Sequence, residues 1–338
     1  MKTTRNVSTR PRMTLPVTQK DLYRHEGFVS IYVCMTHRCN LSCEHCYNQI
    51  ARRDHLVRAA ITTQKARRIV KEVNGCGFAH PFYDLSGGEL MLLPDWREST
   101  EVFLGTGRQV SVNTNGTLIN SEVAMLLAAL GQSYPDQLFL SVSLDSHDPE
   151  INIRSRPGAA SNNVYTAMEL LKKHGVRFRA AVTLTSINRP TIVETVRFIV
   201  KNYTREFIIG VLRPVFPMTS DGLTKLVPLI EVQKAKAEIL KLQDEFGPLT
   251  MYHTLDANGQ AFCRAGLDRL NIEPNGDVTA CYTLQGQDNV VGNVFNKPMP
   301  QIVQRLHRAH SARDTRYLLC EHQGKKWGEV PEGLRFGL

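Results

Sequence analysis

Three cysteines lie close together near the start of the chain, at Cys39, Cys43 and Cys46. Thiolate sulfur is a ligand of both iron–sulfur clusters and structural zinc, and these spacings allow one tight loop to bring three thiols to one centre. A ferredoxin would supply a fourth local cysteine, and this run does not. A [4Fe–4S] cluster with three protein ligands keeps one iron open, so the run predicts a catalytic cluster, with zinc as the alternative.

The other five cysteines are spread along the chain. Cys263, Cys281 and Cys320 lie late, whereas Cys34 and Cys76 stand apart. Without a signal-peptide core at the N-terminus, eight cysteines do not suggest a disulfide framework, and thiols in a reducing compartment usually bind metal. We interpret Cys34 and Cys76 as buried apolar residues; in the alternative interpretation one of them donates a hydrogen atom in the active site.

The composition is that of a globular protein with a substantial core, since 42% of the 338 residues are hydrophobic. No apolar run approaches the roughly 18–20 residues that cross a bilayer, so we expect a cytoplasmic protein without a membrane partner. The net charge of +9 comes from scattered Lys and Arg residues without interleaved aromatics. We therefore expect no nucleic-acid partner, and assign the charge to solvated helix faces and an anionic cofactor or substrate.

The elements that must position these cysteines are indicated by an alternation of short β-branched runs with longer amphipathic segments from about residue 30 to 213. This alternation predicts an α/β fold with parallel strands in right-handed βαβ units. Six units are fewer than the eight of a closed TIM barrel, so we expect a partial (β/α)6 TIM-like barrel. The expected strands are Ser30–Met35, Phe82–Leu85, Gln109–Thr114, Leu138–Leu144, Phe178–Leu184 and Phe207–Leu212, and the expected helices lie around Thr63–Val73, Leu93–Phe103, Ser121–Leu130, Asn162–His174 and Thr191–Asn202.

The pattern changes near residue 247. Segment Glu231–Phe246 has the character of a charged amphipathic helix, and the sequence beyond Pro248 is rich in turns, such as the one at Asn275 and Gly276. We therefore expect a flexible N-terminal segment at residues 1–28, the barrel at 29–247 and a small C-terminal domain at 248–338.

The cysteine run, with Tyr47 directly after it and with its place behind the first expected strand, resembles the signature of the radical SAM superfamily. Three further matches follow at the ends of the next three strands. They are Ser86-Gly87-Gly88-Glu89, the segment Asn113-Thr114-Asn115 and the segment Ser143-Leu144-Asp145. The carboxyl ends of barrel strands are where such folds carry their chemistry, which strengthens the resemblance and disfavours zinc.

The resemblance implies roles for these residues. The Gly87–Glu89 stretch would bind the methionine amino group of S-adenosylmethionine (SAM), since glycines let the backbone approach and an acid suits an ammonium. Tyr47, Ser86, Asn113, Asn115, Ser143 and Asp145 would also line the cofactor or substrate site. Either Arg154 or Arg156 would pair with the methionine carboxylate, or sit in solvent.

The late cysteines resemble the SPASM and twitch extensions that carry auxiliary iron–sulfur clusters. Cys263 is followed by twelve residues, Gly276, four residues and Cys281, and a hairpin turning at Asn275–Gly276 would bring the flanks together. A full SPASM domain has several more cysteines, so we expect a truncated, twitch-like domain with one auxiliary cluster on Cys263, Cys281 and Cys320. Its fourth ligand is His322 or an open position; alternatively the cluster has been lost.

The resemblance also implies the reaction. A flavodoxin- or ferredoxin-like one-electron donor would reduce the first cluster, SAM would be cleaved to a 5′-deoxyadenosyl radical, and the radical would take a hydrogen atom from the substrate. Because few residues precede the first strand, no leader-binding module fits, and we expect a small-molecule substrate (an aminocyclitol or sugar) that is dehydrogenated or epimerised. The alternatives are a ribosomal peptide that is cross-linked or epimerised, and a non-catalytic metal-binding scaffold.

Overall fold

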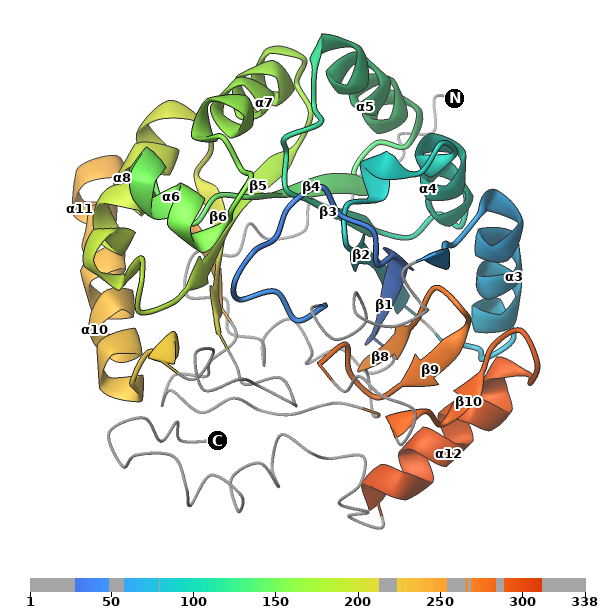
Figure 1. Cartoon of the computed structure of the whole chain (residues 1–338). Helices are drawn as coiled ribbons and strands as arrows, with labels where there is room; N and C mark the ends of the chain where they lie inside the picture. Colours follow the sequence, from blue (N-terminus) through green and yellow to red (C-terminus); the bar gives the residue numbers. More distant parts are fainter. Residues whose placement is uncertain are drawn as a thin grey trace, which may run out of the picture.

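The computed structural model describes residues 28–48, 58–78, 80–212, 224–253, 266, 269–283 and 289–311. A curved sheet of ten strands forms the centre, with helices along its outer face (Figure 1). The strands are β1 (Phe28–Thr36), β2 (His80–Gly87), β3 (Val110–Thr114), β4 (Leu138–Ser143), β5 (Phe178–Leu184), β6 (Glu206–Val211), β7 (Thr250–His253), β8 (Arg269–Ile272), β9 (Asp277–Thr279) and β10 (Gly292–Asn293). The helices are α3 (Thr63–Asn74), α4 (Trp96–Leu104), α5 (Ser121–Ser133), α6 (Pro149–Ser155), α7 (Ser161–Lys173), α8 (Ile192–Asn202), α10 (Leu229–Leu240), α11 (Leu242–Phe246) and α12 (Met299–Ser311), with short 3₁₀ turns at Leu90–Leu92 and Arg189–Thr191.

Strands β1 to β6 pair in parallel and in chain order, as the alternating pattern predicts. Each of the six expected strands is present, and the fold is the expected partial TIM-like barrel. Because the strands are parallel, their carboxyl ends meet at one edge of the sheet, where the expected site residues follow them.

The sheet continues beyond the six expected strands at both ends. β7 pairs in parallel with β6, and β8 pairs in parallel with β1, which places Ile272 beside Val33. β9 and β10 then add antiparallel strands beyond β8. In Figure 1 the orange strands β8 and β9 accordingly lie beside the blue β1. Strands that follow residue 247, where the sequence pattern changes, thus pair with strands that precede it. The division into domains at that residue stays a prediction.

The two faces of the sheet differ in polarity because successive strand residues point to opposite sides. Ile31 and Val33 of β1 face the helices and are fully buried in the main apolar core. The intervening positions face the barrel interior and carry polar groups. There, Asn113 donates to Asp84, and Arg179 Nε donates to Ser141 Oγ at 2.8 Å.

Helix ends explain most departures from the expected boundaries. α4 begins at Trp96 rather than Leu93 because Pro94 disfavours a helical residue before it. Asp95 then accepts from Thr63 N at 2.7 Å and so ties α4 to α3. The expected helix Glu231–Phe246 is divided at Lys241 into α10 and α11. Among the helices of the described ranges, none has both the length and the apolar character needed to cross a bilayer.

Candidate functional site

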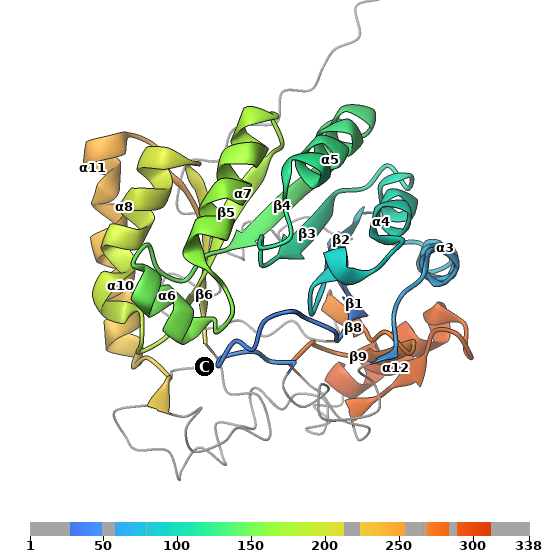
Figure 2. The same ribbon diagram turned by 45° about the horizontal axis from the view of Figure 1, so that its top comes forward.

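The loop after β1 carries Cys39, Cys43 and Cys46 across the carboxyl end of the barrel (Figures 1 and 2). Backbone hydrogen bonds fix it to the segment after α6: Ser42 N donates to Pro157 O at 3.2 Å, and Glu44 N donates to Ser155 O at 3.3 Å. The loop is therefore held by the fold on both sides of its second cysteine.

The surroundings of the three thiols suit an iron–sulfur cluster. Cys43 is buried, and Cys39 and Cys46 are half-buried; the three pack with Leu41 and Ala159 in a small apolar cluster. Leu41 N lies 3.4 Å from Cys39 Sγ as a donor, and such N–H···S contacts are typical of cluster ligands. Burial raises the pKa of the Cys43 thiol to about 11, and the neighbouring thiols Cys46 and Cys39 add to the shift. A positively charged metal centre would offset this repulsion between sulfurs.

Two side chains, one at the end of β3 and one just after α6, reach the sulfurs. Asn115, just after β3, places its Nδ2 3.8 Å from Cys39 Sγ and 2.9 Å from Asn40 Oδ1. Arg156, after α6, places its Nη1 3.8 Å from Cys43 Sγ. Asn115 and Arg156 thus both lie at the cysteine loop.

Gly87 and Gly88 are required by close backbone packing against the cysteine loop. A Cβ on Gly88 would overlap the carbonyl oxygen of Arg38, and one on Gly87 would overlap that of Thr36 and lie 2.9 Å from Cys34 Sγ. Gly87 also has a φ of 122°, which side-chain-bearing residues rarely adopt. The glycines therefore let the end of β2 seat the loop, a role not expected from the sequence.

Glu89 is engaged by the protein itself. Its buried carboxylate accepts from Asn115 N at 2.8 Å, from Met91 N at 3.2 Å and from Thr114 Oγ1 at 3.0 Å. Burial raises its pKa to about 7, even though these hydrogen bonds favour the ionised form. The carboxylate joins the ends of β2 and β3 and so orients Asn115, while its contact with an ammonium stays a prediction.

Asp145 organises the polar side of the site. Asp145 is fully buried. Its Oδ2 lies 2.9 Å from Arg156 Nε and 3.6 Å from His45 Nε2, and it accepts a hydrogen bond from Ser155 Oγ at 2.6 Å. Burial alone would raise the pKa of Asp145, but Arg156, His45 and the hydrogen bonds from Ser155 and Thr183 N hold it below its ordinary value. Asp145 is therefore an anion that positions Arg156.

The structure separates the two candidate arginines. Arg156 is buried beside the cysteine loop, whereas Arg154 is exposed in the last turn of α6. Ser143 is the half-buried last residue of β4 and lies beside Ala181 of β5. His45 is a site residue that was not predicted from the sequence, although its aromatic ring lies within the cysteine run. Its side chain is half-buried, and desolvation lowers its pKa to about 4.

A group of three tyrosines lines the barrel interior next to the loop. The Tyr47 hydroxyl is hydrogen-bonded to that of Tyr32 and lies 3.4 Å from Ser86 Oγ. The ring of Tyr282 stacks on Tyr32 with centroids 4.7 Å apart, and it meets Tyr47 edge-on at 5.0 Å. Burial raises the pKa of both Tyr32 and Tyr47 well above the usual value. Tyr282 directly follows Cys281, so this tyrosine group connects the cysteine loop with the C-terminal hairpin.

The hairpin expected at Asn275–Gly276 is present. β8 and β9 pair antiparallel, and Gly276 in the turn has a φ of 92°. Cys281 follows β9 as a half-buried free thiol, with its Sγ 3.3 Å from Thr283 Oγ1. The remaining expected ligands of an auxiliary cluster, Cys263, Cys320 and His322, lie outside the described residues.

The two isolated cysteines differ in place. Cys34 is 2% exposed on β1, 3.6 Å from His37 Nδ1 and close to the cysteine loop. Cys76 follows the C-terminal end of α3, where its Sγ lies 3.6 Å from Glu72 O. That end of a barrel helix leads into the amino end of the next strand, opposite the cysteine loop. The fold therefore carries Cys76 away from the cysteine loop, and of the two cysteines it is Cys34 that lies beside this loop.

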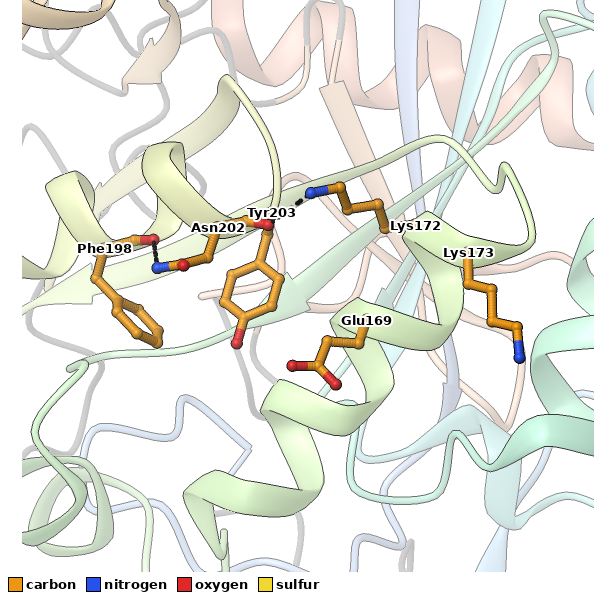
Figure 3. A pocket seen from close by; sticks show the side chains of 6 residues that line it. All are labelled: Glu169, Lys172, Lys173, Phe198, Asn202 and Tyr203. Atoms are coloured by element: carbon orange, nitrogen blue, oxygen red, sulfur yellow. Dashed lines mark hydrogen bonds between the residues drawn. The ribbon is translucent and has the colours of Figure 1, made fainter.

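A surface hollow between α7 and α8 is shown in Figure 3. Lys172 Nζ donates to Asn202 O at 2.8 Å there. The hollow lies at the C-terminal ends of both helices, and hence on the side of the barrel opposite the cysteine loop. It is lined by Glu169, Lys172, Lys173, Phe198, Asn202 and Tyr203.

Comparison with known proteins gives two family matches. The model of the radical SAM superfamily matches residues 33–199, and that of SPASM, an iron–sulfur cluster-binding domain, matches residues 263–322. The first match covers the cysteine loop and strands β2 to β5. The second begins at Cys263 and ends at His322, so it includes every late cysteine.

Similar proteins come from several kinds of pathway. The antilisterial bacteriocin subtilosin biosynthesis protein AlbA of Bacillus subtilis (strain 168) is 26% identical over 316 residues, which cover 89% of this chain and 66% of AlbA. An AdoMet-dependent heme synthase of Methanosarcina barkeri (strain Fusaro / DSM 804) is 32% identical over 163 residues, 48% of this chain and 44% of the synthase. Streptococcus suis SuiB, solved with its precursor peptide SuiA, has the same fold, with a TM-score of 0.69 at 18% identity over 82% of this chain and 65% of SuiB. The chain spans less than two thirds of the length of each of these proteins.

Proposed function

This chain belongs to the radical SAM superfamily and carries an iron–sulfur cluster-binding SPASM domain, and from that premise we propose that it cleaves SAM reductively to modify a peptide. Cys39, Cys43 and Cys46 hold the SAM-binding [4Fe–4S] cluster in this proposal, and Cys281 is one ligand of an auxiliary cluster. A small one-electron donor protein reduces the enzyme.

The observation that carries the proposal is the meeting of the ends of β2, β3 and α6 at the cysteine loop. Asn115 from the end of β3 and Arg156 from the segment after β4 each place a side-chain nitrogen 3.8 Å from a loop sulfur. The end of β2 supports the same loop through Glu89 N, which donates to Arg38 O at 2.8 Å. Donors directed at thiolates tune and orient a metal site, whereas a loop serving only as a connector would not need them.

The residues of the chain have separable tasks in this proposal. When bound, the cluster supplies the electron that breaks a carbon–sulfur bond of SAM, giving methionine and a 5′-deoxyadenosyl radical. Arg156, fixed by Asp145, offers a guanidinium for the methionine carboxylate. The buried Tyr32 and the half-buried Tyr47 form a wall on the barrel side that keeps water from a reactive intermediate.

A peptide substrate is favoured over the small molecule that we expected from the sequence. AlbA, which matches 89% of this chain, is a bacteriocin biosynthesis protein. The heme synthase, whose name implies a different substrate class, matches only 48%. We expected a small molecule because few residues precede β1. That number is no guide to the substrate, because this chain spans only part of the length of its relatives.

The test of the reaction is anaerobic reconstitution followed by assay of 5′-deoxyadenosine. Replacing Cys39, Cys43 and Cys46 with Ala should abolish its formation, and Cys76→Ala is the matched control that should not. A peptide substrate would be identified by transfer of deuterium from labelled peptide into 5′-deoxyadenosine. Transfer from labelled aminocyclitols but from none of the candidate peptides would reject the peptide proposal while leaving SAM cleavage intact.

A further inference from the structure

Two buried polar atoms lie against each other where β1 and β8 end. His37 Nε2 is 2.9 Å from Glu273 Oε2, an ion-pair distance, but the two atoms are not aligned as donor and acceptor. The two groups are in contact, but the N–H direction of the imidazole does not suit a hydrogen bond. A misaligned contact of this kind is a weak hydrogen bond, and a ligand shared by both side chains would satisfy them better.

A thiol completes the group. Cys34 Sγ lies 3.6 Å from His37 Nδ1, and one donor atom from each of Cys34, His37 and Glu273 fits within 4.8 Å of the others. Cys34 is 2% exposed and His37 is 1% exposed. Sulfur, imidazole nitrogen and carboxylate oxygen are the three donor types that proteins use for zinc and similar ions.

We propose that Cys34, His37 and Glu273 bind a divalent transition-metal ion of the zinc type, separate from the iron–sulfur centres. Bonds of about 2.0–2.3 Å around a tetrahedral ion separate its donor atoms by roughly 3–4 Å. The donor atoms here lie within 4.8 Å of one another, so small movements of the side chains would bring them to that spacing.

The neighbours of Glu273 support this role. Asn271 Nδ2 donates to Glu273 Oε1 at 2.7 Å, which leaves Oε2 directed toward His37. Asn271 is itself fully buried, and its Nδ2 is also 3.2 Å from Thr279 Oγ1. A hydrogen bond to the second oxygen of a ligating carboxylate is a common way to orient it.

The position of the ion gives it a structural task. Cys34 lies on β1, His37 directly follows β1 and precedes Cys39 by two residues, and Glu273 follows β8. The pairing of Val33 with Ile272 brings these two ends together. A metal bound there joins the SPASM region to the barrel directly below the loop that carries Cys39.

The proposal is tested by metal analysis of the full chain with its iron–sulfur centres loaded. After removal of loose metal with a chelator, we expect about one zinc ion per wild-type chain. Cys34→Ser and Glu273→Gln should each lose that zinc and keep the wild-type iron content, while Cys76→Ser keeps both. Wild-type protein without zinc, or either ligand variant with wild-type zinc, would overturn the proposal.

X-ray absorption at the zinc edge of the wild-type protein gives an answer that needs no variant. One sulfur together with nitrogen and oxygen neighbours is expected. A shell of three or four sulfurs would place the zinc on other cysteines and contradict the assignment, whatever the variants do to folding.

Discussion

Arg156 and Asp145 form a buried ion pair at the edge of the cysteine loop. Arg156 Nε lies 2.9 Å from Asp145 Oδ2, and Nη2 donates to Oδ1 at 3.2 Å. The remaining guanidinium nitrogen, Nη1, faces Cys43 Sγ. One arginine therefore joins the organising carboxylate to a proposed cluster ligand, and its loss affects both.

Arg156→Ala should be strongly destabilising. It leaves the Asp145 carboxylate buried without its main counter-charge, and breaking such a pair costs about 3–5 kcal/mol. The free energy of unfolding of the cluster-free protein, measured with urea, reports the loss. Arg154→Ala, at an exposed position two residues away, is the control and should change it by less than about 0.5 kcal/mol. Equal losses in the two variants would contradict a buried role for Arg156.

Gly88→Ala should displace the cysteine loop. The added Cβ overlaps the Arg38 carbonyl oxygen, which is backbone and has no flexible side chain to move away. We expect a reduced iron content after reconstitution and less 5′-deoxyadenosine. Gly131→Ala in α5 is the matched control, because no atom lies within 4 Å of its new Cβ and alanine favours a helix. A Gly88→Ala protein with full iron content would refute this account of the glycines.

Glu89 should make stability depend on pH. Its pKa rises from about 4.5 in an exposed state to about 7 in the folded protein, so the folded state binds this proton more tightly. The resulting stabilisation is present below about pH 4.5 and is lost as the pH rises through 7; it is on the order of 3 kcal/mol. Glu89→Gln removes the titrating group. The difference in unfolding free energy between wild type and variant should therefore change between pH 5 and 8, and a constant difference would reject the shift.

The features of this molecule that could be predicted from the sequence are those that depend on residues close together in the chain. Strands β1 to β6 are local patterns of alternation, and the cysteine loop follows from spacing. The partner of β1 is not local: Arg269–Ile272 is only four residues long, and nothing in it identifies Val33 as its neighbour. The choice between Arg154 and Arg156 depended on where the short helix α6 ends, which its seven residues do not reveal.

Tyr32 and Tyr282 should be energetically coupled. Their rings stack at 4.7 Å across the junction between β1 and the C-terminal hairpin, and stacked aromatic pairs contribute about 0.5–1.5 kcal/mol beyond the area that they bury. A double-mutant cycle with Tyr32→Leu and Tyr282→Leu should yield a coupling free energy in that range. Tyr282→Phe should retain most of it, since the ring rather than the hydroxyl makes the contact. Additive losses would show that the two rings act independently.

Cys281→Ala should separate the two proposed clusters. We expect the iron content to fall from about eight to about four atoms per chain while some SAM cleavage persists, because the loop at Cys39 is unaltered. Cys46→Ala should instead abolish SAM cleavage and retain the auxiliary cluster. Electron paramagnetic resonance of the reduced variants distinguishes which signal each one loses. Unchanged iron in Cys281→Ala would exclude this residue as a ligand.

The pairing of β8 with β1 has a consequence for synthesis on the ribosome. β1 emerges among the first elements, and its partner on one side emerges only after the barrel helices. Until then that edge of β1 is an unpaired strand of Ile, Val and Tyr residues, and such edges can pair with other chains. We expect the amide protons on this side of β1 to become protected late in refolding monitored by pulsed hydrogen exchange, and chains released before residue 272 to aggregate.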